Sequence, residues 1–128
     1  MAFDPPEART GKGRTGLARI VAAASYSRDG LRAAFQNEAA FRQLVALHAV
    51  LIPLAFFCPV TPGERALMIA ASLISLVVEL FNSAIEAVVD RVSAERHPLS
   101  KNAKDMGSAA QFIALTMIAA VWGVIFLG

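Results

Sequence analysis

Three long apolar runs follow one another from residue 44 to the end of the chain. They cover about residues 44–60, 66–89 and 106–127. A helix of about 20 apolar residues crosses the hydrocarbon core of a bilayer, and about 17 are enough at the lower limit. Each run therefore predicts a transmembrane helix. The first run is the shortest, and Pro53 is expected to kink it.

An amphipathic stretch precedes these runs, at residues 17–43. Its apolar residues gather on two helical faces, Leu17, Ile20, Val21 and Ala24 on one and Leu31, Ala34, Phe35 and Phe41 on the other. Arginines line the polar sides, and Gly30 predicts a break into two helices. The pattern predicts a surface helix that lies flat on the cytoplasmic side of the membrane. Packing of this helix on the transmembrane bundle is a compatible alternative.

The first 16 residues are polar and contain several Gly, Pro, Arg and Lys residues. They lack the apolar segment of a cleavable signal peptide. We expect them to form a disordered cytoplasmic tail. The remaining residues, 17–128, are expected to form one membrane domain.

The composition agrees with a small membrane protein. Of 128 residues, 56% are hydrophobic and 17% are charged, which is more apolar than an ordinary soluble domain. The length suits one domain. The net charge of +2 gives no indication of a nucleic-acid partner. The single cysteine, Cys58, excludes an internal disulfide and a CxxC metal site.

The positive charges are distributed unevenly and predict an orientation. Of the twelve Lys and Arg residues, seven precede the first run, one follows it at Arg65, and four lie between the second and third runs. Connections that carry Lys and Arg stay in the cytoplasm. The N-terminus and the second connection are therefore expected there, with the first connection and the C-terminus outside.

The second apolar run carries a stripe of polar residues in "ELFNSAIEAVVDR". Its members are Glu79, Asn82, Ser83, Glu86 and Asp90. The spacings from the first residue are 3, 4, 7 and 11, which places all five on one helical face about 100° wide. Ionisable side chains inside a membrane cost about 2.5–3.5 kcal/mol or more at mid-span. The face is therefore expected to line a protein interior or a wet cleft, the alternative being polar contacts between helices.

Depth separates the possible roles of the acids. Along a helix, Glu86 lies about 6 Å and Glu79 about 16 Å from Asp90. A shallow carboxylate suits a hard cation such as Mg²⁺, which takes oxygen ligands and binds phosphates as well. A deeper, less solvated carboxylate suits a general base. Asn82 lies between the two, and Glu38 is a plausible second metal ligand.

Polar residues of the second connection, "HPLSKNAKDMGSAA", are expected to face this stripe. Lys104 can offer a cation to phosphate, and Asp105 beside it can hold that cation oriented; a lysine that only reaches water from the helix end is the alternative. The segment "GKGRTG" lacks the spacing of a phosphate-binding loop. His48, inside the first run, is interpreted as a packing histidine.

Three blocks resemble the small bacterial membrane diacylglycerol kinases: "NEAAFRQ" (37–43), "VELFNSAIEAVVDRVSAERHPLS" (78–100) and "AKDMGSAA" (103–110). "ASYSRDGLRAAF" (24–35) is similar to the family's surface-helix region, and the likeness covers about residues 19–127. The resemblance implies an all-α membrane protein of the bacterial inner membrane, assembled as a homotrimeric bundle with active sites shared between subunits. It also implies phosphorylation of diacylglycerol to phosphatidic acid by ATP with Mg²⁺.

The resemblance also implies roles for individual residues. Glu79 matches the catalytic base, Asn82 an active-site polar residue, and Glu38 and Glu86 the metal ligands. The positions that match nucleotide contacts are Arg19, Tyr26, Glu38, Glu86, Glu95, His97, Lys104 and Asp105. The positions expected to contact the lipid substrate are Ser27, Arg32, Ala40, Glu79, Ser108 and Trp122. The chain departs from the family pattern at Ala22, Arg28, Asp29 and Leu44.

Two other functions are consistent with parts of this pattern. A polyprenol (undecaprenol) kinase of the same fold would also take an alcohol from the membrane, but "AKDMGSAA" favours the diacylglycerol type. A non-enzymatic ion-binding or transport subunit could use the same carboxylates to pass a cation. That function needs acids in more than one span, and the first and third runs have none.

Overall fold

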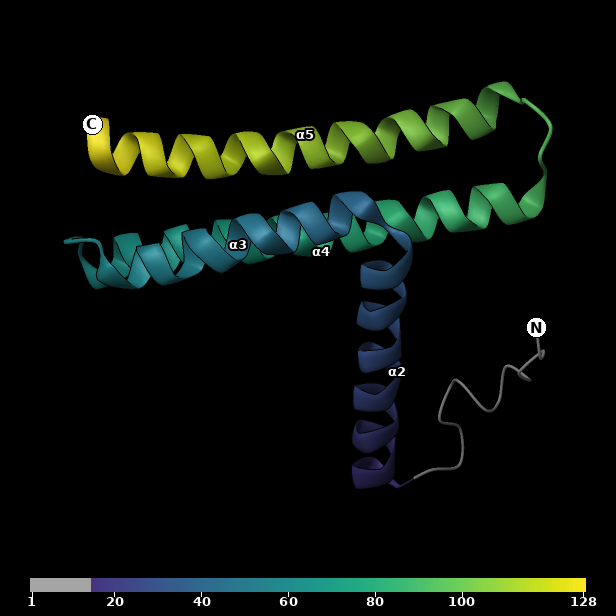
Figure 1. Cartoon of the computed structure of the whole chain (residues 1–128), viewed down its shortest axis with the longest axis horizontal. Helices are drawn as coiled ribbons and strands as arrows, with labels where there is room; N and C mark the ends of the chain where they lie inside the picture. The colour runs from purple at the N-terminus through teal and green to yellow at the C-terminus, as the bar shows by residue number, and fades with distance from the viewer. Residues whose placement is uncertain (1–14) are drawn as a thin grey trace. The chain divides into compact units, whose positions relative to one another are not determined.

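The structure, a computed structural model, describes residues 15–128, and all of the regular secondary structure in this range is helical (Figure 1). The helices are α2 (Gly16–Asn37), α3 (Ala39–Phe57), α4 (Pro62–Val92) and α5 (Pro98–Leu127). Residues 1–14 of the predicted tail lie outside the described residues. Helices α3, α4 and α5 are each long and apolar enough to cross a membrane, so the three predicted spans are confirmed at this level.

The break before the first span lies at Glu38 and not at Gly30. Helix α2 runs through Gly30 without interruption, because one glycine inside a helix costs only about 1 kcal/mol relative to alanine. Glu38 has extended backbone angles, φ −119° and ψ 107°, and occupies the N-cap position of α3. Residues 39–43, assigned from the pattern to the surface helix, therefore begin the next helix.

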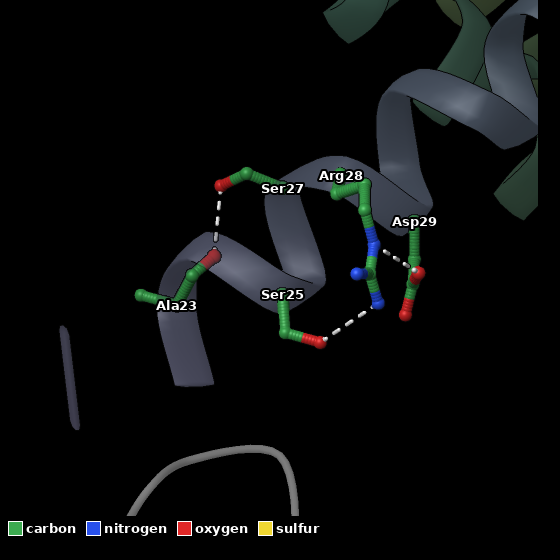
Figure 2. A network of polar contacts seen from close by, with 5 residues as sticks. All are labelled: Ala23, Ser25, Ser27, Arg28 and Asp29. Atoms are coloured by element: carbon green, nitrogen blue, oxygen red, sulfur yellow. Dashed lines mark hydrogen bonds and ion pairs between the residues drawn. The ribbon is translucent and has the colours of Figure 1, made fainter. Parts of the chain in front are cut away.

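Helix α2 carries a local network of polar contacts (Figure 2). Arg28 Nη2 donates to Ser25 Oγ over 3.5 Å, and Arg28 Nε lies 3.6 Å from Asp29 Oδ1. Ser27 Oγ donates to the Ala23 carbonyl oxygen over 2.9 Å. Arg28 and Asp29, two of the departures from the family pattern, thus pair with each other.

Helices α3 and α4 form a hairpin that is closed by hydrogen bonds. Thr61 and Glu64 make a capping box: Glu64 N donates to Thr61 Oγ1 over 3.2 Å, and Thr61 N donates to Glu64 Oε1 over 2.9 Å. Arg65 donates to the carbonyl oxygens of Ala55 and Cys58, each over 3.0 Å. The one cation of this connection therefore satisfies free carbonyl groups at the C-terminus of α3.

A buried histidine links α3 to α4. His48 Nδ1 lies 2.8 Å from the Leu44 carbonyl oxygen, and Nε2 lies 2.7 Å from both the Ser72 carbonyl oxygen and Ser75 Oγ. Only 3% of His48 is exposed. The interpretation of this residue as a packing histidine is confirmed, and its contacts fix the register of the two helices.

Helix α4 packs against both α3 and α5. Its buried residues are Met68, Ala71, Ser72, Ser75, Glu79 and Ser83, which follow a helical period, and most of them are small. Small residues let helix backbones approach closely in an apolar environment. As Figure 1 shows, α4 continues beyond the start of α3 and runs beside α5 to the connection between them. The candidate site lies along this part of α4.

Candidate active site

The acidic face of α4 is graded in exposure along the helix. Glu79 is 6% exposed and Ser83 is 9% exposed. Glu86 is half-buried, and the side chain of Asp90 is exposed. Burial in the fold therefore increases from Asp90 to Glu79, in the same direction as the predicted membrane depth. A buried carboxylate can act as a base only where substrate reaches it, so the surroundings of Glu79 decide its use.

Asn82 lies on the same face, one turn from Glu79, and its side chain is within hydrogen-bonding reach of the Glu79 carboxylate. Its Oδ1 atom is buried and has no hydrogen-bond partner among residues 15–128. A buried acceptor without a partner costs about 1–3 kcal/mol. Asn82 can therefore orient Glu79, while its buried Oδ1 atom remains an unsatisfied acceptor beside the reactive carboxylate.

Glu38 and Glu86 lie within electrostatic reach of Glu79. Glu38 comes from the residue before α3 and Glu86 from α4, so the fold brings together two acids that are 48 positions apart in the sequence (86 − 38 = 48). Among residues 15–128, no three His, Cys, Asp or Glu side chains form a metal-binding group. Mg²⁺ commonly binds one or two carboxylates and completes its shell with phosphate oxygens and water. The chemistry of this donor pair fits that ion.

A cleft of about 780 Å³ opens where α4 ends and α5 begins. Ligand sites in proteins commonly measure about 300–1,000 Å³. Four of the predicted nucleotide contacts line it, namely Glu95, His97, Lys104 and Asp105. His97 is also the N-cap of α5, where its Nδ1 accepts from Leu99 N over 3.1 Å. The fold therefore gathers these four residues into a cavity of suitable size.

Two ion pairs at the cleft differ from the sequence expectation. Lys104 Nζ lies 2.6 Å from Asp90 Oδ1 on α4, and Lys101 Nζ lies 2.6 Å from Asp105 Oδ2. Lys104 and Asp105 were expected to act together, but adjacent residues on a helix do not face each other. The pairing of Lys101 with Asp105 has the four-residue spacing that the sequence could have revealed, whereas the pairing of Lys104 with Asp90 depends on tertiary packing.

The remaining predicted residues are not all near the cleft. Arg19, Tyr26, Ser27 and Arg32 belong to α2, and Ala40 to the first turn of α3. Ser108 is exposed on α5, three positions beyond Asp105. Trp122 is 17 positions from Asp105 (122 − 105 = 17), about 26 Å along the helix. It packs against Phe126 with ring centroids 5.9 Å apart, at the opposite end of α5 from the cleft.

Sequence comparison places the chain among known proteins. Residues 25–126 match the family model described as prokaryotic diacylglycerol kinase. A diacylglycerol kinase of Pseudomonas aeruginosa is 68% identical over 117 residues, covering 91% of this chain and 95% of that protein. A diacylglycerol kinase of Haemophilus influenzae is 50% identical, covering 85% and 92%. One of Escherichia coli K12 is 48% identical, covering 84% and 88%.

Proposed function

Because the chain belongs to the prokaryotic diacylglycerol kinase family, it is a kinase that phosphorylates diacylglycerol with ATP as co-substrate, and we propose that the reaction takes place at Glu79. The observation that carries this assignment is the buried Glu79 carboxylate, with Asn82 in hydrogen-bonding reach, on the helix that also lines the cleft. Phosphoryl transfer needs few protein groups beyond a positioned base and charge-neutralising partners.

In the proposed reaction, Glu79 accepts the proton of the primary hydroxyl of diacylglycerol. The hydroxyl oxygen then forms a bond to the γ-phosphorus of ATP, and the bond between that phosphorus and the bridging oxygen breaks. The products are phosphatidic acid and ADP. Because the carboxylate is buried and poorly solvated, it can serve as a general base for an alcohol that arrives from the membrane.

The nucleotide is proposed to bind in the cleft between α4 and α5. Lys104 is the group that would neutralise phosphate charge, and for this its ammonium exchanges Asp90 for phosphate oxygens. This exchange is feasible, because an exposed ion pair contributes only about 0–1 kcal/mol. Glu95, His97 and Asp105 line the same cavity. They are proposed to contact the adenine and the ribose of ATP.

Glu38 and Glu86 are the residues proposed to hold Mg²⁺, because their oxygens are the donors that this ion prefers. When bound, the ion would neutralise negative charge on the phosphates during transfer. The proposal is supported by the electrostatic proximity of both acids to Glu79, which brings the metal ligands and the base into one part of the fold.

We further propose that α2 lies on the cytoplasmic surface of the bacterial inner membrane and that three chains assemble with shared active sites. Support for the first part comes from the exposed apolar side chains of α2, which are Leu17, Ile20, Val21, Leu31 and Phe35. Nucleotide contacts from α2 would be Arg19 and Tyr26. The proposed lipid contacts are Ser27, Arg32, Ala40, Ser108 and Trp122.

The assignment is tested with purified protein in mixed micelles that contain one lipid alcohol at a time. Transfer of labelled γ-phosphate to diacylglycerol, and its absence with undecaprenol, is the expected result. Faster transfer to the polyprenol would overturn the choice of substrate while leaving the kinase chemistry in place. ATP hydrolysis without lipid product, or cation binding without either, would contradict a lipid kinase.

A further inference from the structure

Gly107 lies on α5 at the point where that helix meets Asn82 of α4. It is one of the buried residues of α5. A methyl group built at this position would collide with Asn82 Oδ1 and would lie 3.3 Å from Asn82 Cγ. The backbone of α4 would not collide with this methyl group, since Asn82 Cα would lie 3.8 Å from it, an ordinary contact distance. The missing side chain therefore leaves room for the amide of Asn82 and is not needed to bring the helices together.

This distinction matters because the amide is the part of Asn82 that can form a hydrogen bond with the Glu79 carboxylate. One atom of the amide group, Oδ1, is buried and has no partner among the described residues, and the side chain is in hydrogen-bonding reach of Glu79. An alanine at position 107 could be accommodated by rotating the Asn82 side chain. That rotation would turn the amide away from its present position beside the carboxylate.

We infer that Gly107 is a positioning residue, which holds the Asn82 amide beside the Glu79 carboxylate by carrying no side chain of its own. The inference rests on the proposed function in so far as Glu79 is taken as the base. Gly107 does not touch the substrate and acts through Asn82. A displacement of a reacting group by about 1 Å can lower a rate by about 10²-fold, so a single methyl group is sufficient to have a large effect.

The chain offers a matched control on the same helix. Gly123 also lies inside α5, and a methyl group built there meets nothing within 4 Å. Gly107→Ala and Gly123→Ala are thus the same chemical change in the same helix, with and without Asn82 as a neighbour. Both raise the helix propensity of α5 by the same amount, so propensity cannot account for a difference between them.

The experiment measures kcat, the KM for ATP and the KM for diacylglycerol in full-length protein in mixed micelles. For Gly107→Ala we expect kcat to fall by about 10²-fold with the KM for ATP within about twofold of the parent, because the cleft is not changed. Gly123→Ala should stay within about twofold of the parent in all three constants. Full activity of Gly107→Ala would overturn the inference.

A double-mutant cycle separates a positioning role from a packing role. In an Asn82→Ala background, Gly107→Ala should cause no further loss of kcat, because the group that it displaces is absent. Equal losses in both backgrounds would show that Gly107 acts on packing and would overturn the inference. If Gly107→Ala alone fails to fold, the double variant should fold, since the colliding side chain is gone. A double variant that also fails to fold would contradict the contact with Asn82.

A spectroscopic arm keeps this test independent of the kinase assignment. The side-chain amide resonance of Asn82, assigned from its disappearance in Asn82→Ala, should shift in Gly107→Ala and stay in place in Gly123→Ala. An inactive parent protein would contradict the proposed function, while the resonance would still report on the contact. An unchanged resonance in Gly107→Ala would contradict the contact, whatever the activity of the parent.

Discussion

The two ends of α4 use their polar groups differently. At the end that joins α3, Thr61, Glu64 and Arg65 all make hydrogen bonds within the chain. At the end that joins α5, Asn82 Oδ1 is buried with no partner among residues 15–128, and Asp90 lines a cleft together with Glu95 and Asp105. The first arrangement contributes stability, because it satisfies helix termini. The second reduces stability, because a buried acceptor without a partner costs about 1–3 kcal/mol.

This contrast gives a rule for interpreting variants of the protein. Changes at the α3 end of α4 should lower stability and leave turnover unchanged. Changes at the α5 end should lower turnover without lowering stability. Sites built for function commonly carry such unsatisfied groups at the expense of stability. Substitutions of Glu79, Arg65 and Glu86 test this rule, and the largest effect is expected at Glu79.

Glu79→Gln should lower kcat by about 10²–10⁴-fold, because glutamine keeps the size of the side chain and loses the base. The protein should still assemble, since an amide is easier to bury than a carboxylate. Glu64→Gln, the same substitution at the other end of the same helix, is the matched control and should leave turnover unchanged. Turnover of Glu79→Gln within threefold of the parent would show that Glu79 is not the base.

Shared sites can be tested by mixing Glu38→Gln with Glu79→Gln. Within one chain Glu38 already lies in electrostatic reach of Glu79, so a shared site requires that the Glu38 serving it come from a neighbouring subunit instead. In that case about a quarter of the sites in random trimers contain both intact residues. Activity should therefore rise from near zero to about a quarter of the parent. No recovery in trimers shown to be mixed would place both residues in one chain, and the kinase assignment would be unaffected.

Much of this architecture could be predicted from the sequence. Apolar length was enough to predict three spans, and a period of 3.6 residues was enough to place Glu79, Asn82 and Glu86 on one face of α4. The rise per residue predicted the separation of these acids along the helix, whereas their burial depends on the packing of α4 against α3 and α5. The spans, the shared face and the separation depend on residues close together in the sequence, so the periodic pattern of the sequence predicts them.

Other features depend on contacts between helices and could not be predicted. The pairing of Lys104 with Asp90 joins α5 to α4, and the fit of Asn82 against Gly107 depends on how closely those helices approach. The position of the helix break was also missed. A break was expected at Gly30, but α2 ends at Asn37 and the extended residue is Glu38.

Arg65→Gln tests the α3 end of α4. The guanidinium donates to two carbonyl oxygens over 3.0 Å, and hydrogen bonds that involve a charged group contribute about 1.5–3 kcal/mol each. Because the glutamine amide can still donate a neutral hydrogen bond to one of these carbonyl oxygens, we expect the variant to be less stable by about 2 kcal/mol. Stability is measured by denaturant unfolding in detergent, and turnover should be unchanged at permissive temperature. Arg65→Lys keeps the charge without the planar fork and should recover only part of the stability. A loss of turnover with full stability would contradict the division between the two ends.

Glu86→Gln gives the smallest expected effect and tests the metal ligands. The loss of one carboxylate should raise the Mg²⁺ concentration needed for half-maximal rate by about tenfold, equivalent to about 1.4 kcal/mol. Higher Mg²⁺ should therefore restore part of the activity, and the KM for ATP should improve in parallel, since the phosphates share the ion. Glu64→Gln, at the α3 end of α4, should leave the Mg²⁺ dependence unchanged. If the rate of Glu86→Gln is insensitive to Mg²⁺ across the millimolar range, Glu86 serves only in helix contacts, and the α5 end of α4 holds the base without the metal.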